Sequence, residues 1–147
     1  MTDLKKILIE KINASDWWHV PPRDSNAYEK RGKFLTSTYA EAEFYGRPNN
    51  DPEKVYVANP LFGFSEMEIL EKLFGGSKGR SLMREMLHKD TYQVRTDLDA
   101  KMCDRARHLN YDAIVLMTAS GKKFLQRGIK PKSIELNLMN TLCYADS

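Results

Sequence analysis

The chain has very few of the residues that build disulfide frameworks and metal centres. Its 147 residues include two cysteines, Cys103 and Cys143, and three histidines. So few cysteines exclude a disulfide scaffold, and they make a reducing, cytoplasmic location the expectation. Cys103 lies in a helical pattern and is predicted to be a core residue. The histidines have no ligand spacing with one another or with the cysteines, so we expect no metal site.

Long apolar runs are also absent. No segment approaches the roughly 20 apolar residues of a membrane-spanning helix, and Glu10 and Lys11 interrupt the amphipathic start, which therefore does not resemble a signal peptide. With 41% hydrophobic and 29% charged residues, the composition predicts one soluble domain over residues 1–147. The net charge of +3 permits a protein or nucleic-acid partner but indicates neither, and no membrane partner is expected.

The most informative stretch is residues 31–45, RGKFLTSTYAEAEFY. It predicts a strand at 33–35 and a helix that begins at Thr38, because Thr38 and Glu41 form a capping-box pair. Such a strand-to-helix corner leaves backbone N–H groups and hydroxyls on one side, which suits an anion or a polar ligand. The plainer interpretation is that Thr36 and Ser37 only end a strand and cap a helix.

Hydrophobic periodicity and turn residues predict the remaining elements. Helices are expected at 3–13, 65–74, 82–87 and 96–109, and strands at 17–20, 54–58, 111–117, 123–126 and 133–139. Residues 23–31 and 47–53 are predicted loops, residues 75–79 a turn, and Asn110 a left-handed helix end. Strands and helices are segregated more than alternated, so the predicted fold class is α+β with a mostly antiparallel sheet system.

Four segments, in this order, resemble the ADP-ribosyltransferase family, whose members cleave NAD. They are WWHV at 17–20, KFLTSTYAEAEFY at 33–45, KVYVANPL at 54–61, and the run HLNYDAIVLM, SGKKFLQ and IKPKSIEL from residue 108 onward. They are most similar to the His-Tyr-Glu branch, in its small phage and bacterial members. The resemblance implies two small, mostly antiparallel sheets packed together with flanking helices.

The resemblance also implies that NAD binds as a substrate. The residues implied to bind it are His19, Arg23, Thr36, Ser37 and Tyr45, with Arg31 as a further candidate. His19 would contact the adenosine ribose, and Tyr45 would pack by the nicotinamide ring. The arginines are candidates for the pyrophosphate, since a guanidinium pairs well with phosphate oxygens. Each residue has a plainer interpretation as well: a half-buried strand residue, a helix cap, a core aromatic or a solvated loop charge.

The chain departs from the family at the catalytic acid. Family members place a glutamate at the start of the penultimate strand, where it stabilises the positive charge that develops as nicotinamide leaves. The matching segment, SGKKFLQ, has Lys122 and Lys123 there. The predicted catalytic residues are Glu135, the nearest acid in sequence, and Gln126, which could bind the ribose. The plainer interpretation of Glu135 is a solvated strand residue. Other acids that could serve are Glu41 and Glu43.

Two functions of different classes follow. The first is an NAD-dependent mono-ADP-ribosyltransferase, a phage or bacterial effector that modifies a protein or nucleic acid and releases nicotinamide. The second is a catalytically degenerate protein of the same fold that inhibits a partner protein by binding it, which Lys122 and Lys123 favour. A third interpretation is an unrelated α+β domain. Basic residues that could meet nucleic acid or an acidic protein, or are only solvated, are Lys78, Arg80, Arg84, Lys89 and Arg95.

Overall fold

The computed structural model describes residues 3–89 and 91–139. Its helices are α1 (Leu4–Asn13), α2 (Asn26–Arg31), α3 (Tyr39–Ala42), the 3-10 helix η1 (Glu43–Tyr45), α4 (Glu66–Phe74), α5 (Gly76–Lys89), α6 (Tyr92–His108) and α7 (Gly121–Gln126). Its strands are β1 (Trp18–His19), β2 (Lys33–Thr36), β3 (Pro60–Gly63), β4 (Ala113–Met117) and β5 (Ile134–Leu138). The mixture of helices and sheet confirms the α+β prediction at this level.

The strands form one sheet in the order β1-β2-β5-β4-β3. Three neighbouring pairs are antiparallel, and β3 with β4 is parallel. The mostly antiparallel pairing agrees with the prediction. The expectation of two packed sheets was wrong for the part of the chain that the structure describes, which has a single five-stranded sheet.

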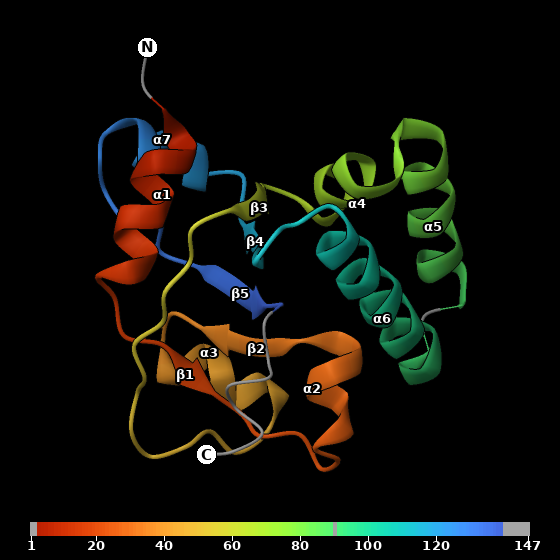
Figure 1. Cartoon of the computed structure of the whole chain (residues 1–147), viewed down its shortest axis with the longest axis horizontal. Helices are drawn as coiled ribbons and strands as arrows, with labels where there is room; N and C mark the ends of the chain where they lie inside the picture. The colour runs from red at the N-terminus through yellow and green to blue at the C-terminus, as the bar shows by residue number, and fades with distance from the viewer. Residues whose placement is uncertain (1–2, 90, 140–147) are drawn as a thin grey trace.

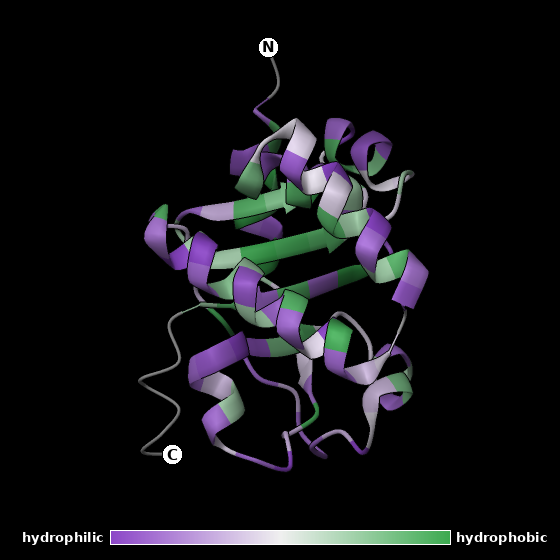
Figure 2. Ribbon diagram, turned by 90° about the vertical axis from the view of Figure 1, so that its right-hand side faces the viewer, coloured by the Kyte–Doolittle hydropathy of each residue, from purple (hydrophilic) through white to green (hydrophobic). Residues whose placement is uncertain are grey.

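Helices cover both faces of this sheet, and each face has its own core. Figure 1 shows α1 and α7 on one side of the strands and α4, α5 and α6 on the other. The first core joins Leu8 and Ile12 of α1 with Leu125 of α7 and alternate residues of β5. The second joins α4 and α6 to the opposite face and includes the buried Cys103, as predicted. In Figure 2 the strands are mainly hydrophobic in colour, behind helices that carry many hydrophilic residues.

Three predicted helix ends are confirmed. Thr38 caps α3 by accepting a hydrogen bond from the Glu41 N–H, and Ser65 caps α4 through the Glu68 N–H in the same way. Asn110 adopts the left-handed conformation (φ 66°) after α6. These signals depend on neighbours three or four residues apart, so the sequence is sufficient to read them.

The predicted strand at 54–58 is instead an extended segment without strand pairing. Val55 and Val57 are buried, which explains the alternating pattern. Side chains take the place of a neighbouring strand: Asn13 Oδ1 accepts from the Val57 N–H at 2.8 Å, and Asp112 accepts from the next two N–H groups. The edge strand β3 begins at Pro60, where an edge position tolerates the missing N–H.

Residues 23–31, predicted as a loop, contain α2. This helix packs against α6, and Arg107 of α6 donates to the backbone carbonyls of Tyr28 and Glu29. Gly32, at φ 81°, follows α2 and turns the chain into β2. The helix is therefore supported by a partner almost 80 residues away in sequence, which local pattern does not show.

Residues 123–126, predicted as a strand, belong to helix α7, with Leu125 in the first core. A short apolar run does not distinguish a buried strand from one buried turn of helix.

The predicted turn at 75–79 is also mostly helix: only Gly75 (φ 89°) ends α4, and α5 begins at Gly76. Helix α6 begins earlier than predicted, with Thr91 as its cap.

Candidate functional site

A cleft of about 50 Å³ lies on the α4/α6 face of the sheet. Its floor includes Phe34 of β2 with Glu135 and Asn137 of β5, and its wall includes polar side chains of α4 and α6. The strand pairing explains this placement: Asn137 is opposite Phe34, and Glu135 is opposite Thr36 across the β2–β5 pair. Directly opposed residues of an antiparallel pair share one face, so these four side chains lie together.

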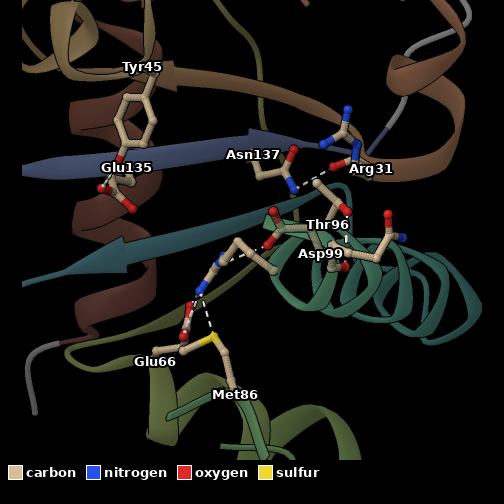
Figure 3. A network of polar contacts seen from close by, with 10 residues as sticks. Arg31, Tyr45, Glu66, Met86, Thr96, Asp99, Glu135 and Asn137 are labelled. Atoms are coloured by element: carbon tan, nitrogen blue, oxygen red, sulfur yellow. Dashed lines mark hydrogen bonds and ion pairs between the residues drawn. The ribbon is translucent and has the colours of Figure 1, made fainter. Parts of the chain in front are cut away.

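Glu135 is in direct contact with Tyr45. The Tyr45 hydroxyl donates to Glu135 Oε1 at 2.5 Å, across 90 residues of sequence (Figure 3). The side chain of Tyr45 is 65% exposed, but its hydroxyl end points to the sheet. Partial burial and the bond to Glu135 raise the pKa of the Tyr45 hydroxyl well above its usual range. The Tyr45 hydroxyl therefore keeps its proton throughout the neutral range and can donate it in this hydrogen bond.

Arg95 organises the wall of the cleft. Its guanidinium contacts both oxygens of Glu66 (2.8 and 2.7 Å), the Asp99 Oδ1 (2.9 Å) and the Met86 Sδ (3.2 Å) (Figure 3). Burial raises the pKa of the Asp99 carboxyl, and the attraction of Arg95 opposes this rise. With Glu135, three acids and one arginine line the cleft, so its charge is on balance negative.

Asn137 connects the floor to the end of α2. Its Nδ2 donates to the Arg31 carbonyl at 2.9 Å. Its Oδ1 is buried and has no hydrogen-bond partner within residues 3–89 and 91–139. This oxygen lies against Gly32, where a Cβ would come within 2.3 Å of it. The amide thus requires a glycine at position 32 and holds β5 against the turn before β2.

His19 lies in β1, buried, and both of its ring nitrogens are engaged. Nδ1 is 2.7 Å from the Phe34 carbonyl, and Nε2 is 2.8 Å from the Tyr28 hydroxyl. Because a carbonyl only accepts, Nδ1 carries the hydrogen and Nε2 accepts from Tyr28. Burial lowers the pKa of His19 and favours this neutral form. The ring holds β1, β2 and α2 together, and neither nitrogen is directed at a ligand.

The hydroxyls of the strand-to-helix corner are also used internally. Thr36 Oγ1 donates to the Thr38 carbonyl at 2.8 Å. Ser37 and Ser133 both donate to the Glu41 carboxylate, at 3.0 and 2.7 Å, which ties α3 to the start of β5. The corner lies beside Glu135, because Thr36 is the strand partner of Glu135.

The remaining predicted residues lie apart from this cluster. Gln126 is exposed at the end of α7, on the opposite face of the sheet from Glu135. Arg23 is exposed in the loop before α2. Arg31 lies closer, and its positive charge acts on the Asp99 carboxyl. The structure therefore groups Thr36, Ser37, Tyr45 and Glu135 and separates Gln126 and Arg23 from them.

Sequence reasoning missed the wall of the cleft. Arg95 and Asp99 are four residues apart on α6, and this spacing of opposite charges could have identified them as a pair on one helix face. Glu66 carried no such signal, since it meets Arg95 from a different helix, 29 residues away.

Comparison with protein-family models, curated proteins and solved structures found no match. In the described ranges, no three or more His, Cys, Asp or Glu side chains are placed to hold a metal ion. No helix among the described residues has the length and apolar character to cross a bilayer.

Proposed function

We propose that the protein is an NAD-cleaving ADP-ribosyltransferase that uses Glu135 as its catalytic carboxylate and Tyr45 as the aromatic beside nicotinamide. The observation that carries the proposal is the contact between these two residues at the edge of a cleft, next to the Thr36–Ser37 corner. Tyr45 is implied by the family resemblance, Glu135 is the nearest acid in sequence to the segment where the chain departs from the family, and the two are 90 positions apart. The acceptor of ADP-ribose is a protein or a nucleic acid.

In this proposal the reaction breaks the bond between the nicotinamide nitrogen and the ribose C1′. The bonding electron pair leaves with nicotinamide, and positive charge develops on the ribose. The Glu135 carboxylate stabilises that charge, which is the main requirement of the step. An acceptor nucleophile then bonds to C1′ and loses its proton to solvent. Tyr45 offers a ring face on which the cationic nicotinamide stacks.

The proposal requires a local movement. The cleft encloses about 50 Å³, whereas sites for drug-sized ligands span about 300–1,000 Å³. Only the nicotinamide end of NAD can enter, after Tyr45 turns away from Glu135, while the remainder lies on the surface. The exposure of Tyr45 (65%) and of Phe34 (44%) allows this arrangement.

The test is calorimetric titration with NAD, followed by measurement of nicotinamide release from the same sample. We expect the Glu135→Gln variant to bind NAD but to release nicotinamide at least about 100-fold more slowly. Losses of this size follow when a group that stabilises the charge of a transition state is removed. Tyr45→Ala should weaken NAD binding. Glu10→Gln, which removes an exposed acid of α1 on the other side of the sheet, and Tyr56→Phe, which alters an exposed tyrosine, are the matched controls. Release that is unchanged in Glu135→Gln would exclude Glu135 as the catalytic acid.

A second function is favoured by a specific observation. Lys122 and Lys123 lie on helix α7, where the family resemblance leads one to expect a strand with a catalytic acid. A protein of this fold without catalysis would act by binding and inhibiting a partner protein. Folded wild-type protein that neither binds NAD nor releases nicotinamide would favour this function over the first.

A further inference from the structure

Helix α5 is the most peripheral helix on its side of the sheet. It packs against α4 and α6 and is placed beyond both of them from the strands (Figure 1). Its inner side places Leu82, Met83 and Met86 against the second core. Gly79 is the one residue of α5 that is buried, so the outer half of the helix is open to solvent.

The solvent-exposed surface of α5 is strongly basic, with cations on both flanks of the helix. Lys78, Arg80, Arg84 and Lys89 are all exposed, and Glu85 is the one acid of the helix. Within the described residues, none of these four cations has an ion pair or a hydrogen bond from its side chain. By contrast, Arg95 of the neighbouring helix α6 has two carboxylate partners, Glu66 and Asp99. Four cations without partners on one helix leave a positive surface that an anionic partner can neutralise.

The spacing of these charges suits an extended polyanion. At about 3.6 residues per turn, Arg80 and Arg84 lie one turn apart on one flank of α5, whereas Lys78 and Lys89 lie on the other flank, about 16 Å apart along the axis. Cations on both flanks of a helix can reach the phosphates on both sides of a groove. A helix with a free outer side fits the major groove of duplex nucleic acid, which is about 12 Å wide. Dispersed lysines and arginines are the groups that neutralise backbone phosphates.

The same surface suits an acidic protein less well. Stable protein interfaces depend on buried aromatic and apolar anchors with fixed arginine contacts. On α5 the single large apolar side chain that is prominently exposed is Leu87. Long side chains without fixed partners match a regular row of phosphates better than a specific protein pocket.

We propose that the outer face of α5 is a docking surface for the phosphate backbone of duplex nucleic acid. This inference does not depend on the proposed function, because none of its residues belongs to the cleft. It assigns a role to Lys78, Arg80, Arg84 and Lys89 and separates them from Arg95, which serves the cleft wall.

The test is fluorescence anisotropy of a labelled 20-base-pair duplex of mixed sequence, titrated with the full chain from 50 to 200 mM salt. If all four cations contact phosphates, log K should fall with log salt at a slope of about −3.6. The Arg80→Ala/Arg84→Ala variant should reduce that slope by about 1.8 and weaken binding at 50 mM salt at least about tenfold. Arg80→Lys/Arg84→Lys keeps the charge and should retain most of the affinity.

The matched control is Lys6→Ala/Lys11→Ala, which removes the same charge from α1 on the other side of the sheet. This variant should bind as the wild type does. Equal weakening by the two alanine pairs would show that net charge alone attracts the duplex and would overturn the proposal. Absence of duplex binding at 50 mM salt, or tighter binding of polyglutamate than of the duplex, would overturn it as well. Circular dichroism melting of each variant verifies that it is folded.

Discussion

Gly79 determines how closely α5 approaches α4. A Cβ at this position would lie 2.8 Å from the Glu71 backbone N, 2.9 Å from its Cα and 2.9 Å from the Leu70 carbonyl carbon. These are backbone atoms, so Gly79→Ala must push the two helices apart. Overpacking of this kind costs about 1–3 kcal/mol, against which the better helix propensity of alanine returns up to about 1 kcal/mol.

We therefore expect Gly79→Ala to lower the free energy of unfolding by about 1–2 kcal/mol. At about 2–4 °C per kcal/mol for a chain of this size, Tm should fall by roughly 2–8 °C in a calorimetric scan. Gly76→Ala, three residues earlier on the same helix, is the matched control. Its Cβ would meet only the flexible Arg80 Nη1, at 3.2 Å, so its Tm should be unchanged or slightly higher. If both variants raised Tm alike, Gly79 would not be the residue that sets the close approach of α4 and α5.

Two further predictions concern buried polar groups. His19 is neutral in the folded state with a pKa below its ordinary 6.5, so its contribution to stability is complete above about pH 6.5 and is lost as pH falls through the lowered pKa. Between pH 7.5 and pH 5.5 the urea concentration at the unfolding midpoint should decrease more for the wild type than for His19→Gln. An equal decrease in the two proteins would show that His19 does not cause the pH dependence. Lys33, with a side chain 8% exposed, is 2.5 Å from Glu53. Glu53→Gln should therefore cost about 1–3 kcal/mol in urea unfolding, because it leaves a buried ammonium less well paired. The exposed pair of Lys54 and Asp16 is the control: Lys54→Ala should change stability by less than about 1 kcal/mol, and an equal effect of the two substitutions would disprove the argument.

Part of the candidate site could be predicted from sequence and part could not. Tyr45 was named from the family resemblance and Glu135 as the nearest acid in sequence, and their contact depends on β5 pairing with β2. Arg95 was named only as one of several basic residues that could meet nucleic acid or an acidic protein or be solvated, although it pairs with Glu66 and Asp99 in the cleft. Glu66 lies on a different helix, so its distance from Arg95 in sequence follows no fixed spacing.

The sequence by itself determined the features that depend on near neighbours. Thr38 with Glu41, Ser65 with Glu68, and Asn110 specify helix ends through hydrogen bonds or backbone conformation that a few residues decide. The apolar periodicity of residues 3–13 likewise predicted α1. In each case the energy that selects the conformation is local, so the pattern of residues is enough.

Only the tertiary structure decided the rest, because long-range contacts outweigh weak local preferences. The segment 54–58 is not paired as a strand, and the side chains of Asn13 and Asp112 accept from its Val57 and Ala58 N–H groups. The run at 123–126 is helical, with Leu125 in the core. His19, implied by resemblance as a ligand contact, uses both ring nitrogens within the protein. A short segment is compatible with more than one secondary structure, and contacts with residues distant in sequence decide which of them it adopts.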